Sequence, residues 1–198
     1  MDKSLIINKL RIMTKPTRTV IMLAAAALPG TGAQAQPATV ASGACGDNLT
    51  WTLTGDSVLT IRGTGEMYSF GGESMPPWYD YGDQIKAVVI GDSVTDICGE
   101  AFSRCSALNS VNIPSSVTDI SKHSFYHCKE LSAITSLRTQ PQPISDVFPE
   151  MDMRYCTLYV PVGSVAAYRE AGGWRDFVNI EPIPATAAGA DTLVVWWT

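Results

Sequence analysis

Apolar positions between residues 88 and 133 recur with a period of 23 residues. Residues 88–110 read VVIGDSVTDICGEAFSRCSALNS, residues 111–133 read VNIPSSVTDISKHSFYHCKELSA, and ten of the 23 aligned positions are identical. Chance alone would give about one or two identities at ordinary composition. Because the identities are mostly apolar and unevenly spaced, they predict a solenoid in which each coil adds a strand and a corner to one continuous core.

The polar and apolar pattern also predicts the course of each coil. Val111 and Ile113 alternate with polar residues, which indicates a strand with its aliphatic side chains inward. Pro114 ends this strand because proline cannot donate to a ladder. The chain then returns to the core across a turn and a short helical stretch. We expect these core positions: Val88, Ile90, Val94, Ile97, Phe102, Cys105, Leu108, Val111, Ile113, Val117, Ile120, Phe125, Cys128 and Leu131. A third coil begins at Ile134 and loses the pattern over residues 138–143.

The segments beside the repeats predict caps. Residues 49–53 and 58–61 alternate around a Gly/Asp turn, which indicates a hairpin able to cover the open edge of the first coil. At the other end, residues 158–160 form an expected strand, residues 161–164 a turn with a helix N-cap, and residues 165–170 a short helix. We expect Trp174 and Phe177 to close the last coil.

The two ends of the chain have compositions of their own. Residues 20–28 are an apolar run that follows five basic residues and precedes Ala33-Gln34-Ala35, the pattern of a signal peptide cleaved before Gln36; translation could start at Met1 or Met13. Residues 184–190 read as a linker, and residues 193–198 as the start of a strand without an evident partner. The expected domains are therefore a leader (1–35), an N-terminal cap (36–84), repeats (85–156), a C-terminal cap (157–183), and a linker with a further strand (184–198).

Charge and length limit the classes of partner. The chain carries a formal charge of -5, and removal of residues 1–35 leaves 9 basic and 18 acidic residues. A surface of this sign repels phosphate backbones and anionic lipid, so we expect no nucleic-acid partner. The apolar run of nine residues would span about 14 Å as a helix, so we expect export without membrane insertion after cleavage.

Three motifs bear on chemistry. Gly91-Asp92-Ser93 after a strand resembles the nucleophile block of GDS-type esterases, but such enzymes need a base histidine from a late D-x-x-H motif, which the sequence lacks.

His123 and His127, four apart beside Cys128, could place two metal ligands on one helix face, although we favour solvated side chains. Five cysteines leave disulfide connectivity open, and we favour buried free thiols that stack from coil to coil. We expect no cofactor.

The repeat residues also carry a family resemblance. SVTDICGEAFSRCSALNSVNIPSSVTDISKHSFYHCKEL is similar to the BspA-type bacterial leucine-rich repeat, and the resemblance extends over about residues 43 to 183. It implies a short, β-rich α/β leucine-rich-repeat solenoid with few coils, a hairpin cap and a strand-helix cap. It also implies a non-catalytic secreted or cell-surface protein that binds an extracellular or surface protein in adhesion.

The outward side chains of the strands are the candidate binding face. Equivalent positions of successive coils would align Val89, Asn112 and Thr135 in a row, with Ser110 beside it. Trp78, Tyr79 and Tyr81 could add affinity, although we favour a place in the cap core for them. Two alternatives remain: a structural spacer that presents a following C-terminal segment, and, more remotely, a GDS-type esterase.

Overall fold

The computed structural model describes residues 20–22, 36–72, 74–184 and 194–196. Most of the expected leader (1–35) and nearly all of the expected linker (184–190) lie outside the described residues. For the strands at 20–22 and 194–196, only the backbone is described.

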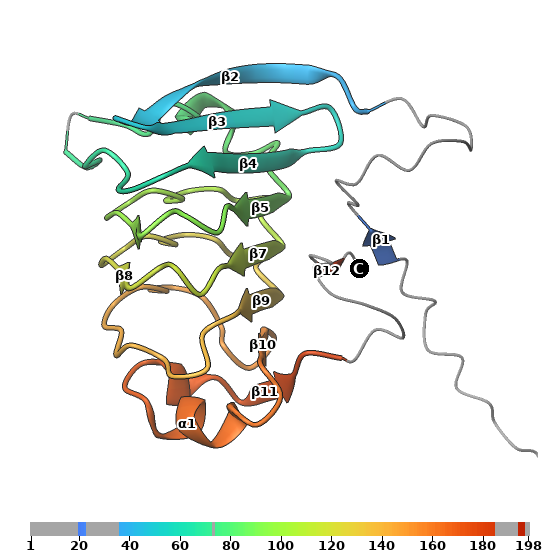
Figure 1. Cartoon of the computed structure of the whole chain (residues 1–198), viewed down its shortest axis with the longest axis vertical. Coiled ribbons are helices and arrows are strands. Elements are labelled where there is room, and N and C mark those ends of the chain that lie inside the picture. Colours follow the sequence, from blue (N-terminus) through green and yellow to red (C-terminus); the bar gives the residue numbers. More distant parts are fainter. Residues whose placement is uncertain (1–19, 23–35, 73, 185–193, 197–198) are drawn as a thin grey trace, which may run out of the picture.

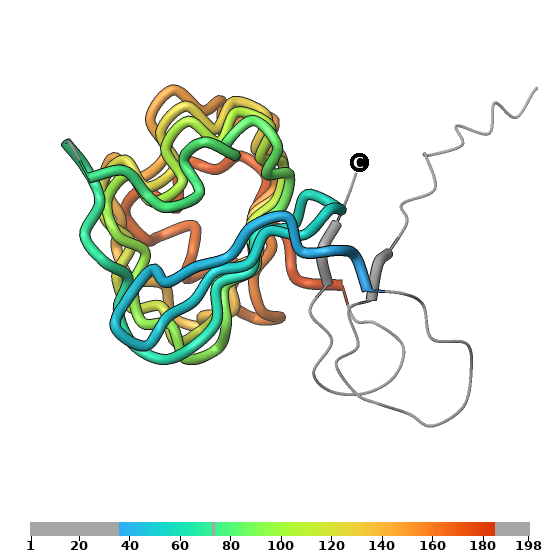
Figure 2. The backbone as a smooth tube through the Cα atoms, turned by 90° about the horizontal axis from the view of Figure 1, so that it is seen from above, coloured from blue at the N-terminus to red at the C-terminus, as the bar shows by residue number. Residues whose placement is uncertain are grey.

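The repeats form a solenoid built on a ladder of parallel strands (Figure 1). The ladder contains β4 (Val58–Gly63), β5 (Ala87–Ile90), β7 (Ser110–Ile113), β9 (Ala133–Ser136), β10 (Thr157–Val160) and β11 (Asn179–Pro182). Equivalent residues of the repeat are in register, as in the pairs Val88 with Val111 and Val111 with Ile134. Viewed along the stack, the coils lie over one another around a common interior (Figure 2). All fourteen expected core positions point into this interior, and none is more than 6% exposed.

A three-stranded antiparallel cap covers the first coil. The expected hairpin is present as β3 (Leu49–Thr54) and β4, and β4 joins the parallel ladder through β5. A further strand, β2 (Thr39–Gly46), was not predicted from the sequence, and it pairs with β3 at the outer edge of the sheet. Most of its residues are exposed, so β2 lacks the alternation of apolar side chains by which a half-buried strand is recognised.

The far side of each coil is made of turns, and the expected short helical stretch is wrong. After two-residue strands, β6 (Asp96–Ile97) and β8 (Asp119–Ile120), the chain runs in turns. Two residues per coil have a left-handed backbone, and they recur at the 23-residue spacing: Glu100 and Arg104, His123 and His127, Asp146 and Glu150, with φ between 53° and 64°. A left-handed residue interrupts a right-handed helix, so no helix extends through this region.

The third coil is complete, although its sequence loses the pattern at residues 138–143. Its left-handed residues and Phe148 follow their equivalents in the second coil by 23 residues. The His123 N–H donates to the Asp146 carbonyl (2.7 Å), and the Phe125 N–H donates to that of Val147 (3.1 Å). These bonds show that backbone pairing between coils persists where side-chain identity fails.

A ladder of aromatic rings runs through the core. Trp78, Phe102, Phe125 and Phe148 stack with ring centroids 5.7, 5.2 and 5.2 Å apart. The indole of Trp78 also donates to the Ala101 carbonyl (2.8 Å), which joins the cap to the first coil. The ladder therefore links the N-terminal cap to the third coil without a break.

The C-terminal cap ends this ladder. α1 (Val165–Glu170) has the expected bounds, and the 3-10 helix η2 (Trp174–Asp176) follows it. Phe177 contacts Phe148 edge to face (5.5 Å), and the Trp174 indole donates to the Gln142 carbonyl (2.8 Å). Ser164 is the N-cap residue of α1, as expected, but its side chain makes no capping hydrogen bond. The packing of buried Tyr168 and Trp174 holds this short helix instead.

The two outlying strands pair with each other. β12 (Val194–Trp196) runs antiparallel to β1 (Val20–Met22) and lies against β7. The terminal strand, expected to have no partner, has one in the full-length chain. That partner lies inside the expected leader.

All five cysteines are buried free thiols, as we expected. Burial raises the pKa of Cys45 to about 11 and the pKa of Cys98, Cys105 and Cys156 to about 12. It also raises the pKa of Cys128, whose thiol donates to the Phe102 carbonyl (3.1 Å). Since the thiolate is the reactive form, these side chains are unreactive in the folded chain.

Removal of one ring from the middle of the ladder tests its contribution. Phe125→Ala should lower the free energy of unfolding by about 3–5 kcal/mol, because it leaves a cavity between two stacked neighbours. Urea denaturation measures this loss, with Tyr155→Ala as the matched control because Tyr155 is 78% exposed. Equal losses in the two variants would contradict a stabilising ladder.

Thiol titration tests the redox state and burial together. With a chromogenic disulfide reagent, the folded protein should show almost no fast-reacting thiol at pH 8, and all five thiols should react in guanidinium without reductant. Fewer than five in guanidinium would show that a disulfide exists.

Candidate binding surfaces

The outer face of the parallel sheet contains the row that the repeat predicts. Val89 pairs with Asn112, Asn112 with Thr135, and Thr135 with Tyr159. The alternation of each strand turns these side chains away from the aliphatic core. Strand register thus aligns equivalent outward positions of successive coils.

This row is largely covered in the full-length chain. Asn112 is 4% exposed, Ser110 5% and Thr135 9%, whereas Val89 is half-buried beside Val58 and Ala87. The strand that holds Ser110 and Asn112 is the one against which β12 lies. Within the described residues, the Asn112 Nδ2 and Ser110 Oγ atoms have no hydrogen-bond partner. Val89 is therefore the accessible member of the predicted face.

The Gly91-Asp92-Ser93 block is a structural corner. The Ser93 carbonyl accepts a hydrogen bond from Gly65 N–H (3.0 Å), and the next residue, Val94, bridges to Gly65. Ser93 itself is exposed. His123 and His127 belong to the next coil, and their equivalents in the coil of Ser93 are Glu100 and Arg104. Neither histidine is therefore part of this corner. The block holds the first coil to the cap loop.

The histidines lie on turns and not on a helix face. His123 is exposed, and the His127 Nδ1 atom lies 3.0 Å from a carboxylate oxygen of Glu150. Cys128 is fully buried and turned to a backbone carbonyl, so it does not join them as a surface ligand. In the described part of the chain, no three or more His, Cys, Asp or Glu side chains are grouped so that they could hold a metal ion.

A cavity that the sequence did not predict lies where the N-terminal cap meets the turns of the first two coils. Its volume is about 520 Å³, and its lining includes Tyr79, Ser103, Arg104, His123 and Tyr126. Of the three aromatics expected in the cap core, Trp78 is buried and Tyr81 half-buried, but Tyr79 is 39% exposed. The sequence feature that could have indicated this cavity is the order Tyr79, Ser103, Tyr126 at one repeat position. It can be recognised only once the alignment of the coils is known.

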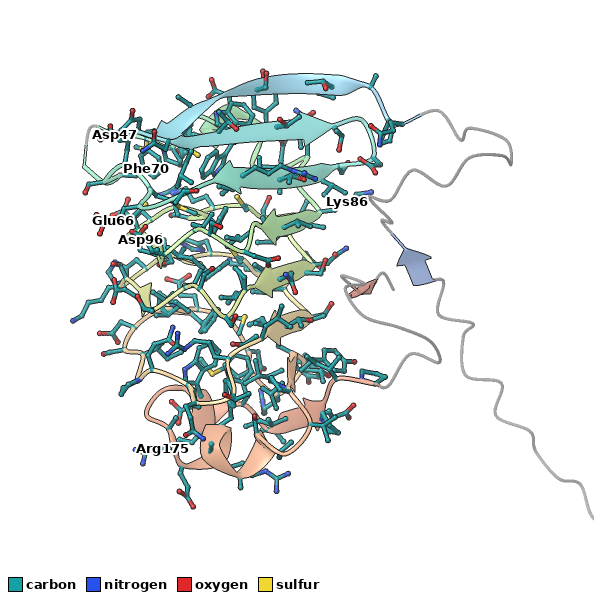
Figure 3. All side chains as sticks on the ribbon, in the orientation of Figure 1. Asp47, Glu66, Phe70, Lys86, Asp96 and Arg175 are labelled. Carbon is teal, nitrogen blue, oxygen red and sulfur yellow. The ribbon has the colours of Figure 1, made fainter. Side chains whose placement is uncertain are left out.

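Acidic side chains gather on the side opposite strands β5, β7 and β9, where Asp47, Glu66 and Asp96 lie (Figure 3). Asp96 Oδ1 accepts a hydrogen bond from Met67 N–H (2.8 Å). Burial raises the pKa of Asp96, and the nearby carboxylates of Glu66 and Asp119 raise it further. Ionisation of Asp96 is therefore disfavoured in the folded chain.

Comparison with known proteins assigns the repeats to a family. Residues 78–148 match the family model described as "BspA type Leucine rich repeat region (6 copies)". These residues are a BspA-type leucine-rich repeat region, which confirms the resemblance for the repeats, whereas its expected extension to residues 43–77 and 149–183 lies outside this match. A crystal structure of a leucine-rich repeat protein from Eubacterium ventriosum is similar at 21% identity and a TM-score of 0.46, over 63% of this chain and 38% of that one. No curated protein matches the sequence.

Neutralisation of Asp96 tests its electrostatic cost. A raised pKa in the folded state means that this group favours folding at low pH and does so less as pH rises through its folded pKa. Asp96→Asn keeps the acceptor for Met67, so the wild-type chain should lose stability relative to this variant as the pH rises from below the ordinary pKa of an aspartate towards neutrality. Urea unfolding across that range measures the difference, and a relative gain for the wild type would contradict it.

Proposed function

We propose that this chain is an exported, non-catalytic protein of the cell surface whose solenoid binds an extracellular or surface protein in adhesion. The observation that carries the proposal is the in-register ladder, in which each coil repeats the same outward positions beside those of its neighbours. Such rows form extended binding surfaces in repeat proteins. Leucine-rich repeat regions commonly bind proteins, and this chain contains one at residues 78–148.

The signal-peptide pattern of residues 1–35 supports export. Among the described residues, no helix has both the length and the apolar character needed to span a bilayer. A binding role without catalysis is supported by the corner position of Ser93, which has no histidine beside it in the repeat register. Typical members of this repeat family are also non-catalytic.

Polar groups on the sheet also favour a binding role. Asn112 Nδ2 and Ser110 Oγ are buried and unpaired within the described chain, and each such group costs about 1–3 kcal/mol. A partner that displaced the covering segment and supplied acceptors would recover this free energy. The sheet face of Val89, Asn112, Thr135 and Ser110 remains a candidate contact on this basis.

Display and adhesion can be tested in one experiment with intact cells that carry the full-length chain. Antibody should label these cells without outer-membrane rupture, and the cells should adhere to wells coated with matrix or mucin proteins. Val89→Arg should leave labelling unchanged but reduce adhesion about tenfold, because it places a long charged side chain on the accessible part of the sheet face. Thr118→Arg, at an exposed corner, is the matched control.

Protection from antibody until the outer membrane is broken would contradict surface display. Labelled cells that do not adhere would favour the alternative of a spacer module. Adhesion that survives Val89→Arg would remove the sheet face from consideration while leaving the adhesive function in place.

A further inference from the structure

One repeat position on the turn side of the solenoid alternates between large and small side chains. The residues that follow the four stacked rings are Tyr79, Ser103, Tyr126 and Pro149. Each therefore lies beside the ring ladder on its own coil, and Ser103 lies between two tyrosines. Neighbouring coils are about 4.8 Å apart at the strand ladder, so the tyrosines are separated by about twice that distance. Tyr79, Ser103 and Tyr126 all line the cavity of about 520 Å³, and we call the part of it beside the small side chain of Ser103 the slot.

The walls of this slot are held in place. The Tyr126 ring lies 4.0 Å from the ring of His127, centroid to centroid, and its hydroxyl donates to a carboxylate oxygen of Glu150 (3.3 Å). Tyr79 begins the 3-10 helix η1 (Tyr79–Tyr81), directly after buried Trp78. A short backbone bond from Arg104 N–H to the Tyr126 carbonyl (2.7 Å) fixes the two coils at this point. The slot is thus formed before any ligand enters it.

The lining also contains groups that recognise a peptide. Arg104 is exposed, and its guanidinium takes part in none of the ion pairs found among the described residues. It can therefore receive a carboxylate, and His123 beside it can donate a further hydrogen bond. The Glu100 carboxylate on the same lining can accept a peptide N–H. Exposed Met75 extends the apolar wall beyond Tyr79.

We propose that this slot binds one aromatic side chain of a protein partner, between Tyr79 and Tyr126. An acidic residue adjacent to that aromatic residue in the partner's sequence then forms an ion pair with Arg104. The proposal rests on the adhesive function and adds a contact on the turn side, away from the sheet face. A planar ring can pack against tyrosine side chains that line the same cavity, and aromatic, methionine and arginine side chains are enriched at the centres of protein interfaces. Met75 and Pro76 favour an aromatic side chain over a sugar ring, because they enlarge the apolar part of the lining.

The probe is N-acetyl-Asp-Trp-amide, titrated into the isotope-labelled chain and followed by the backbone amide signals of Ser103, Arg104 and Tyr126. We expect saturable shifts there with a dissociation constant of about 1 mM, which suits a ligand of this size. N-acetyl-Lys-Trp-amide should bind several-fold more weakly. In Arg104→Gln this preference for the acidic peptide should disappear.

A variant that fills the slot provides the decisive comparison. Ser103→Trp should abolish the shifts, because the new ring occupies the space of the ligand, while Ser106→Trp on the exposed surface of the same coil should leave them unchanged. Unchanged binding in Ser103→Trp would overturn the proposal, as would an unchanged charge preference in Arg104→Gln. Shifts produced by sialyllactose and not by the peptide would also overturn it in favour of a sugar.

The same variants separate this proposal from the adhesive function. Cells that display Ser103→Trp should adhere about tenfold less than wild-type cells. Adhesion that survives this substitution would overturn the slot as the partner's contact and leave adhesion in place. Wild-type cells that fail to adhere, although the peptide shifts the slot signals, would overturn adhesion and support a peptide site.

Discussion

The stack of aromatic rings between coils is the contact on which the rest of the structure depends. Backbone hydrogen bonds hold each strand to the next, but they do not determine what fills the interior. Phe102, Phe125 and Phe148 fill it at one position per coil, 5.2 Å apart. Each cap adds a tryptophan that contacts an end of this stack, Trp78 by stacking and Trp174 edge to face, and each indole N–H donates to a carbonyl of the adjoining coil. A short solenoid has few interfaces between coils. Caps that extend the apolar core and also form hydrogen bonds with it therefore supply a large share of its stability.

The left-handed residues determine what the turn side can present. Glu100, Arg104 and their equivalents adopt φ values that cost a residue other than glycine about 1–2 kcal/mol. Glycine would avoid this cost but would present no side chain. The repeat instead places charged residues and histidines at these positions. Some form ion pairs between coils, as Asp146 does with Lys122, and others form none within the described chain, as is the case for Arg104. The turn side is therefore chemically varied, whereas the sheet side carries small and polar residues.

These two sides differ in how accessible they are to a partner. On the sheet side, Ser110, Asn112 and Thr135 are buried in the full-length chain, and β12 lies against their sheet. On the turn side, Tyr79 and Tyr126 line a cavity that also contains Arg104, whose guanidinium takes part in none of the ion pairs found among the described residues. A partner that used the slot would bind without displacing the terminal strand, and one that used the sheet would compete with it. The full-length chain is thus better prepared for contact through its turns.

The sequence alone determined the period, the parallel strands, the hairpin cap and the short C-terminal helix, because each depends on apolar spacing that is local in the chain. It could not reveal β2, which buries little, or the left-handed turns, because charged residues and histidines carry no local signal for that conformation. It also did not show that the third coil is complete, since backbone pairing with the second coil holds residues whose pattern has been lost. The slot could not be predicted from the sequence either. Tyr79 and Tyr126 are 47 positions apart, and only the stacking of coils puts them on either side of Ser103.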